Sequence, residues 1–438
     1  MAARIRGVLI GILLWTALAP ALKAGEIPAI LGLKDQAAVY DRWLDTRLEK
    51  LLPELMRREK LDMWLVICEE YNEDPVYLSL VPFTSLSARR LTMLVMFDRG
   101  GEKGVERFSV NRYGIGRLFP TLWKADEEDQ WQALARAVKE RDPKRIGIDE
   151  SDIFAFGDGL SASKKARLVQ ALGPEFAKRL VSAERLAVGW LERRLPEEIE
   201  VYHHICAVAH AIIREAFSST VITPGITATA DVEWWIWEKF RALGQTTWFH
   251  PGISLQRPKS SPFKDSPVIH PGDLLHCDIG IDYLRLNTDT QQLAYVLRPG
   301  EADAPPGLKA ALAQGNRLQD ILLEEMKEGR TGNQILAAAL KRARDEGLRP
   351  SIYTHPLGVH GHAAGPTIGL WDRQGGVPGP GDYPLFADTV FSIELNVLAA
   401  VAEWDDQDVQ IALEQDAAVT RSGKVFLDKR QTELILVK

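Results

Sequence analysis

Cysteine is scarce in this chain of 438 residues: Cys68, Cys206 and Cys277 are the only three, and they lie far apart. An odd, scattered set predicts neither a disulfide framework nor a cysteine-based metal site. Each of them sits in an apolar run, so we expect buried free thiols, with a single Cys68–Cys206 bridge left open as an alternative. Nothing in their pattern indicates a catalytic thiol.

A basic surface is also lacking. Asp and Glu outnumber Lys and Arg by 60 to 53, and the net charge is -7. Nucleic-acid-binding proteins carry a basic patch or stripe, so this composition argues against a nucleic-acid partner. The N-terminal half contains no phosphate-cradling glycine loop and no histidine, because the first of the nine histidines is His203. The chemistry is therefore expected in the second half.

Residues 1–24 have the composition of a secretory signal peptide. Arg4 and Arg6 precede an apolar run from Val8 to Leu22, and small residues lead up to Gly25. The run is short and interrupted by Gly and Pro, which favours a cleaved signal over a membrane-spanning anchor. We expect the mature protein in the periplasm or secreted beyond it, with no membrane attachment after cleavage.

The remaining chain is too long for one compact core of ordinary size and predicts two domains. The first, over 30–190, mixes amphipathic helical spacing with continuous apolar runs of the kind found in interior strands, which is typical of an α/β domain. The boundary falls near Trp190–Pro196, where a proline and two acids favour the start of a helix. In the first domain we expect helices over 41–58 and 128–139 and strands over 61–68, 91–97 and 145–149.

The second half gathers histidines in the segment 353–362. His355, His360 and His362 lie there within a few residues, among glycine and proline. A loop can direct several imidazoles at one point, whereas a regular element would splay them. A solvated turn is the simpler explanation for any one of these histidines alone, but the set indicates a site.

Four acids occur inside strand-like apolar runs. Asp278 and Asp289 fall on the two arms of a predicted hairpin, Glu394 shares one strand face with Ser392 and Asn396, and Glu414 lies in the run 409–420. A buried carboxylate is costly unless a positive charge meets it. Acids on the wet face of the strands are the alternative for each position singly. Jointly, the four acids predict a metal cage.

The ligand candidates follow one another in the order Asp, Asp, His, Glu, Glu. The first histidine opens the motif His355-Pro356-Leu357-Gly358, with His362 shortly after it, and the last acid lies in a strand that ends Ala-Val-Thr. In these motifs residues 190–438 resemble the M24-type metallopeptidases, the group of methionine aminopeptidase, aminopeptidase P, prolidase and creatinase. The candidates in this order are Asp278, Asp289, His355, Glu394 and Glu414.

The resemblance implies an α+β chain: a C-terminal pita-bread fold over 191–438, preceded by a smaller, creatinase-like α/β domain. It implies an exported peptidase for short peptides, an aminopeptidase or dipeptidase of Xaa-Pro type, with a homodimer as one arrangement the group allows. Two divalent ions are implied, and a hard, oxygen-rich ligand set suits Mn²⁺, Co²⁺ or Zn²⁺.

The resemblance also assigns roles to the site residues. Asp278 and Asp289 would hold one ion, Asp289 and Glu414 would bridge, and His355 and Glu394 would hold the other. Glu394 would also act as proton shuttle, while His362 would contact the substrate carbonyl. His360 is the second candidate for substrate binding.

The sequence departs from the group in three places. The window 257–262 lacks the histidine that usually precedes the first acid, and only His250 and His270 lie nearby. Ala363 stands where an acid is common, and 289–292 lacks the usual threonine and basic residue. These changes predict an altered substrate pocket beside an intact metal site. Hydrolysis of another C–N bond, as in creatinase, and a non-catalytic binding role therefore remain alternatives.

Overall fold

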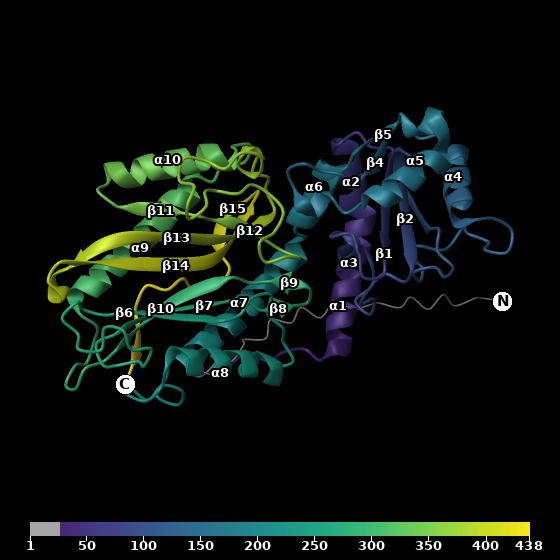
Figure 1. The fold of residues 1–438 in the computed structure, drawn as a ribbon. Coiled ribbons are helices and arrows are strands. Elements are labelled where there is room, and N and C mark those ends of the chain that lie inside the picture. Colours follow the sequence, from purple (N-terminus) through teal and green to yellow (C-terminus); the bar gives the residue numbers. More distant parts are fainter. Residues whose placement is uncertain (1–26) are drawn as a thin grey trace, which may run out of the picture.

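The structure is a computed structural model that describes residues 27–438. The predicted signal peptide lies outside the described residues. Two large β-sheets, each with its own helices, lie side by side, the N-terminal one at the right of Figure 1 and the C-terminal one at the left, and β8 and β9 form a separate two-stranded sheet. Within the part of the chain described, no helix has the length and apolarity that a membrane crossing requires.

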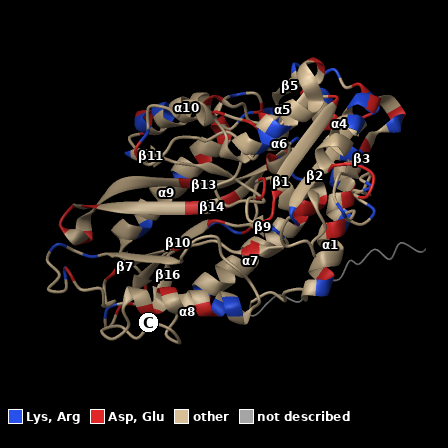
Figure 2. Ribbon diagram, turned by 45° about the vertical axis from the view of Figure 1, so that its right-hand side comes forward, with Lys and Arg blue, Asp and Glu red and all other residues tan. Residues whose placement is uncertain are grey.

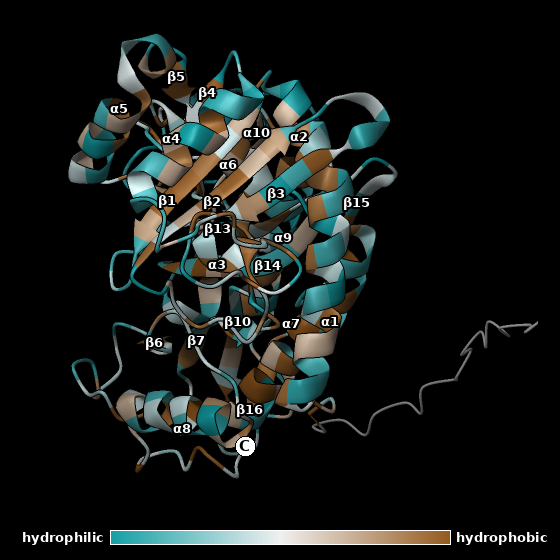
Figure 3. Ribbon diagram, turned by 90° about the vertical axis from the view of Figure 1, so that its right-hand side faces the viewer, coloured by the Kyte–Doolittle hydropathy of each residue, from teal (hydrophilic) through white to brown (hydrophobic). Residues whose placement is uncertain are grey.

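The N-terminal sheet has five strands in the order β3-β2-β1-β4-β5, with β1 antiparallel to β2 and parallel to β4. Side chains of β1 alternate between two cores: Met63, Leu65 and Ile67 pack towards α4 and α5, whereas Trp64 and Val66 pack towards α1, α2 and α6. Both faces are covered, which explains the continuous apolar runs that are brown in Figure 3. The elements are β1 (Met63–Glu69), β2 (Leu91–Asp98), β3 (Val105–Ser109), β4 (Ile146–Ile148), β5 (Leu180–Ser182), α3 (Tyr77–Leu80), α4 (Gln130–Arg141), α5 (Ala162–Ala177) and α6 (Glu184–Glu192), with 3₁₀ turns η2 (Gly101–Lys103) and η3 (Ala155–Gly157).

One long helical segment precedes this sheet. It consists of α1 (Leu33–Thr46), a π-helical turn η1 (Arg47–Leu51) and α2 (Leu52–Arg58). Pro53 has no N–H to donate back along the helix, and the wider turn lies directly before it. The helix predicted over 41–58 is confirmed, although it begins earlier and contains this π-helical turn.

The C-terminal sheet runs β11-β13-β14-β10-β7-β6, with β12 beside β13, β15 beside β14 and β16 beside β10. Helices α9 and α10 pack with one part of the sheet, and α7 and α8 with another. The elements are α7 (Pro196–Ala216), α8 (Thr229–Ala242), β6 (Gly252–Gln256), β7 (Leu274–Ile279), β8 (Asp282–Tyr283), β9 (Leu286–Asn287), β10 (Thr290–Val296), α9 (Pro306–Glu325), α10 (Gly332–Asp345), β11 (Pro350–Ile352), β12 (His355–Leu357), η4 (Pro380–Asp382), β13 (Thr389–Val401), η5 (Ala402–Trp404), β14 (Gln407–Thr420), β15 (Gly423–Phe426) and β16 (Ile435–Val437).

Several local predictions are confirmed. The proline and acids near residue 196 do begin a helix, α7, and the three cysteines are buried free thiols. In β13 the apolar residues from Phe391 to Val397 face the core against α9, which leaves Ser392, Glu394 and Asn396 on the other face. Positive and negative side chains are interspersed along the described helices in Figure 2.

Candidate metal centre

A row of polar side chains crosses four neighbouring strands of the C-terminal sheet. Asp278 of β7 is paired with Gln291 of β10, Gln291 with Glu414 of β14, and Glu414 with Glu394 of β13. Residues directly opposite one another on adjacent strands project from the same face of a sheet. The register therefore brings three of the predicted acids together across strands that are distant in sequence.

Asp289 and His355 complete the group from the ends of two strands. Asp289 directly precedes β10, and His355 begins β12, where it is paired with Ser392 of β13. His355 Nε2 lies 3.4 Å from Asp289 Oδ2 and 3.6 Å from Glu414 Oε1, and Ser392 Oγ donates a hydrogen bond to Glu414. All five predicted ligands thus meet at one place.

Four ligand atoms of this group lack hydrogen-bond partners although they are buried. One oxygen each of Asp278, Asp289 and Glu414, together with His355 Nε2, is in this position. His355 Nδ1 lies 3.0 Å from the Pro356 carbonyl and donates to it, so in the neutral ring Nε2 carries a lone pair. A lone pair that faces carboxylates without a donor between them is unfavourable, and a cation would satisfy every one of these atoms. The residues fit a divalent metal ion.

The electrostatics support the same conclusion. Burial, reinforced by neighbouring carboxylates, raises the pKa of Glu394 to about 9 and that of Glu414 to about 8. Burial also raises the pKa values of Asp278 and Asp289 well above their ordinary range. Burial opposes protonation of His355, but the charges of Glu414 and Glu394 outweigh it and raise the pKa of His355. Four acids this close cannot all be ionised unless positive charge lies between them.

The other two histidines of the segment point in different directions. His362 is exposed; its ring lies 4.6 Å from that of His355 and packs against Trp248. The side chains packed around part of its ring, together with the neighbouring His355, lower the pKa of His362 to about 4, which keeps it neutral near pH 7. His360 instead stacks on Phe156 of the N-terminal half at 4.7 Å. The role of His360 in substrate binding stays a prediction, with the ring placed between the two halves of the chain.

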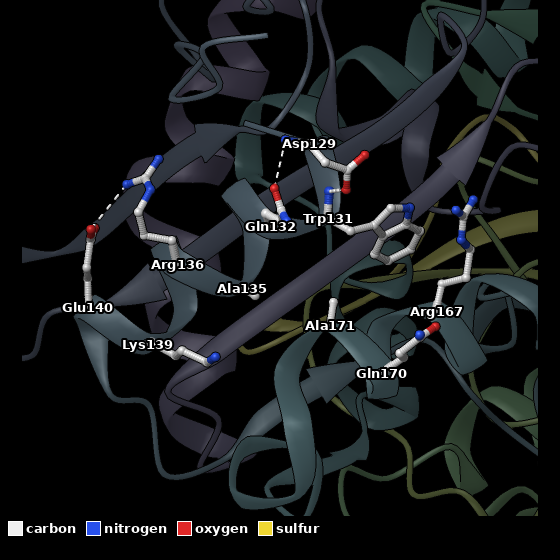
Figure 4. A pocket seen from close by; sticks show the side chains of 10 residues that line it. All are labelled: Asp129, Trp131, Gln132, Ala135, Arg136, Lys139, Glu140, Arg167, Gln170 and Ala171. Carbon is white, nitrogen blue, oxygen red and sulfur yellow. Dashed lines mark hydrogen bonds and ion pairs between the residues drawn. The ribbon is translucent and has the colours of Figure 1, made fainter. Parts of the chain in front are cut away.

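A cavity of about 370 Å³ opens over the metal centre. Its polar part consists of Tyr353, His355, His362, Thr367 and Glu394, and most of the remaining wall is apolar. A larger cavity, of about 620 Å³, lies between α4 and α5, far along the N-terminal domain (Figure 4). Several of its charged groups already have partners, since Arg136 pairs with Glu140 at 3.1 Å and the Asp129 side chain caps α4. Of these two cavities in the described part of the chain, the smaller one combines apolar walls with unpartnered ligand atoms.

The region before the first acid brings no further histidine to this cavity. His250 packs edge-on against Trp237, and His270 stacks on Phe263 at 3.6 Å. Arg257 is buried, pairs with Asp273 at 2.8 Å and donates to backbone carbonyls of its own loop. The loop that begins at Arg257 is thus organised around the Arg257–Asp273 ion pair, and it supplies no histidine to the cavity.

Gln291 is a member of the site that sequence reasoning missed. Its Nε2 donates to Glu394 Oε1 at 2.7 Å and lies 3.4 Å from Asp278 Oδ2, while its Oε1 lies 2.8 Å from His276 Nε2. The amide therefore orients two predicted ligands, Glu394 and Asp278, and is itself oriented by His276. Residues two apart in a strand project from the same face, so the sequence could have placed Gln291 on the face of Asp289. Its hydrogen-bond partners could not be predicted, because they depend on the pairing of three strands.

Residues 200–421 match metallopeptidase family M24. No curated protein sequence matches the chain. Among solved structures, an X-Pro aminopeptidase from Thermotoga maritima MSB8 is similar at 17% identity and a TM-score of 0.62, covering 88% of this chain and 100% of its own.

Two further solved structures agree with this. An Xaa-Pro dipeptidase from Bacillus anthracis is 17% identical with a TM-score of 0.59, over 91% of this chain and 99% of its own. The prolidase from Pyrococcus horikoshii OT3 is 16% identical with a TM-score of 0.57, over 89% and 100%. At these identities the likeness concerns the fold. The α+β architecture, with an N-terminal domain ahead of a pita-bread domain, is confirmed over nearly the whole chain.

Proposed function

Because the chain belongs to metallopeptidase family M24, we propose that it is an exported peptidase that holds two divalent ions and cleaves short peptides of Xaa-Pro type. The single observation that carries the proposal is the set of buried, unpartnered ligand atoms on Asp278, Asp289, His355 and Glu414 beneath an open cavity. A binding module without metal chemistry would have no reason to leave four such atoms unsatisfied.

Two ions suit this ligand set in charge and in geometry. Ligand atoms of Asp278, Asp289 and Glu414 lie within 4.8 Å of one another, and so do those of His355, Glu394 and Glu414. These two groups share Glu414, as a bridging ligand requires. Four carboxylates would balance the charge of two divalent cations. When bound, such ions would polarise a peptide carbonyl and lower the pKa of a water molecule.

Glu394 and His362 are the residues placed to act on a peptide. Glu394 lines the cavity, and Gln291 engages its Oε1, so Oε2 is free to accept and return a proton. His362 also lines the cavity, and its neutral ring can donate an N–H to the oxygen of the scissile carbonyl. The apolar wall excludes water around the bond to be cleaved.

The preference for proline is part of the proposal because the structurally similar proteins are an X-Pro aminopeptidase, an Xaa-Pro dipeptidase and a prolidase. Export rests on the composition of residues 1–24. Amino-terminal sequencing of the protein from the periplasm of its host tests this part: a mature chain beginning near Gly25 supports export, and an intact Met1 in the cytoplasm contradicts it.

The decisive experiment combines metal content with hydrolysis. The mature protein is loaded with Mn²⁺, Co²⁺ or Zn²⁺, analysed for bound metal, and assayed on matched peptides with and without proline after the first residue. About two equivalents of metal with metal-dependent cleavage support the peptidase. Bound metal without cleavage of any peptide would favour a different C–N substrate, and no bound metal would favour a binding module.

A further inference from the structure

The cavity over the metal centre is lined by both halves of the chain. The segment 153–156 of the N-terminal half contributes Ile153, Phe154 and Phe156, and the C-terminal half contributes Leu370 and Trp371. Ile153 and Trp371 stand at the mouth, with 49% and 79% of their surface exposed. Large apolar side chains exposed around a cavity mark a surface suited to an apolar ligand.

Apart from the proposed metal ions, no cationic side chain of lysine or arginine lines this cavity among the described residues. Among the described residues that line it, Tyr353, His355, His362 and Glu394 are the titratable ones. Buried Arg194 lies beneath Gly358, 3% exposed and 3.8 Å from Glu198, so it is not free to meet a substrate. A carboxylate that entered this cavity would lose its water without gaining a positively charged partner from the protein wall.

The N-terminal part of the wall is held in place by specific contacts. Ser151 Oγ accepts hydrogen bonds from the backbone N–H groups of Ile153 at 3.0 Å and Phe154 at 2.8 Å. Phe154 is buried edge-on against Tyr383, with ring centroids 5.4 Å apart. Phe156 stacks on His360. A wall fixed at three successive points is preorganised and does not need to form around the substrate.

We propose that this wall forms an apolar, uncharged specificity site, so that the chain cleaves peptides with a bulky apolar residue beside the scissile bond and with their terminal carboxylate outside the cavity. It would therefore remove residues from the amino end of longer or amidated peptides and disfavour free dipeptides. The inference rests on the proposed peptidase function and chooses between its two forms, aminopeptidase and dipeptidase.

The test compares two substrates that differ only in charge: the dipeptide Phe-Pro and its C-terminal amide, given to the metal-loaded mature protein. We expect kcat/KM for the amide to exceed that for the free acid by about tenfold or more, because an unpaired carboxylate is strongly disfavoured in an apolar site. Ile153→Arg adds a cation at the mouth and should reduce this ratio by about tenfold. Equal rates on the two substrates in the wild-type protein would overturn the inference.

Two matched variants separate the wall from general effects of charge. Ile226→Arg makes the same change at a side chain that is 75% exposed and does not line the cavity, so it should leave the ratio unchanged. Arg373 shares a turn with Trp371 without lining the cavity, and Arg373→Ala should also leave it unchanged. A change of the ratio in Arg373→Ala, or the same shift in both arginine variants, would contradict the inference.

The side-chain preference has its own readout. Phe156→Ala should lower kcat/KM for Phe-Pro amide relative to Ala-Pro amide, while metal content stays that of the wild type. If the metal-loaded protein cleaves no peptide, the proposed function fails, and calorimetric binding of Phe-Pro and its amide still decides the nature of the site. Tighter binding of the amide supports an uncharged site, and equal or tighter binding of the free acid refutes it.

Discussion

Replacing Gln291 by leucine should weaken metal binding although no proposed ligand is altered. The Gln291 amide donates to Glu394 at 2.7 Å, approaches Asp278 at 3.4 Å and is anchored by His276. Leucine fills a similar volume but cannot donate a hydrogen bond. In the variant, Glu394 is free to rotate away from the position in which it faces Glu414.

The magnitude follows from the hydrogen bond that is lost. A hydrogen bond to a charged group contributes about 1.5–3 kcal/mol, and about 1.4 kcal/mol corresponds to a tenfold change in an equilibrium constant. Loss of a residue that orients a metal ligand commonly costs about 10–100-fold in affinity. We therefore expect the dissociation constant for Mn²⁺ to rise by about 10–100-fold in Gln291→Leu.

The assay is calorimetric titration of Mn²⁺ into metal-free protein, with thermal unfolding of the same metal-free samples. Gln292→Leu is the matched control, because the adjacent residue of β10 projects from the opposite face. Burial lowers the pKa of His276, so its ring is neutral. In Gln291→Leu this ring loses a hydrogen bond but leaves no buried charge unpaired. Thermal unfolding of the metal-free protein measures the stability lost in this way. Unchanged Mn²⁺ affinity in Gln291→Leu, or an equal loss in Gln292→Leu, would refute the reasoning.

Four further predictions concern the site and the N-terminal domain. Asp289→Ala and Glu414→Ala should each bind less than two equivalents of metal and lose at least about 100-fold in turnover, since each removes a proposed bridging ligand; wild-type turnover in Asp289→Ala would exclude the dinuclear assignment. Removing metal with a chelator should lower the melting temperature, because a ligand at 100 times its Kd stabilises the native state by about 2.7 kcal/mol; an unchanged melting curve would contradict this. His360→Ala should keep its full metal content by elemental analysis, because the ring contacts Phe156 and not the acids; lost metal would place it among the ligands. Burial raises the pKa of Asp74 from 3.8 to about 6, so its contribution to stability is present below pH 3.8 and is lost as the pH rises through about 6; denaturation of Asp74→Asn between pH 4 and 8 should show a smaller decline than the wild type, and parallel curves would contradict the shift.

Much of the proposed ligand set was predictable, because acids inside apolar strand-like runs and a cluster of histidines are visible in single segments of the sequence. Alternation along 390–397 places Glu394 opposite the apolar face whatever that strand pairs with, and an acid in such a strand indicates a cation. Gln291 could not be recognised in this way, because a neutral amide in a strand does not require a cation. Its role in orienting Glu394 and Asp278 follows from the pairing of β10 with β7 and β14.

The cavity wall was hidden from the sequence for a related reason. Ile153 and Phe156 belong to a turn in the first domain, and only the docking of the two halves brings that turn to the metal centre. The direction of His360 depends on the same docking, since Phe156 and Pro75 supply its contacts. Periodicity describes one segment at a time and carries no information on contacts between domains.

The helical segment from Leu33 to Arg58 makes the two halves a single cooperative unit. Trp43 packs into the core of α7 and α8, while Leu44 and Leu48 pack into the core of the N-terminal sheet. Between them, buried Arg47 pairs with Glu198 of α7 at 3.0 Å. A fragment containing only the catalytic half would keep Glu198 buried without its partner and would expose the surface that Trp43 covers. The boundary visible in the sequence is therefore a poor place to divide the protein for expression, and calorimetry of the intact chain should show one unfolding transition.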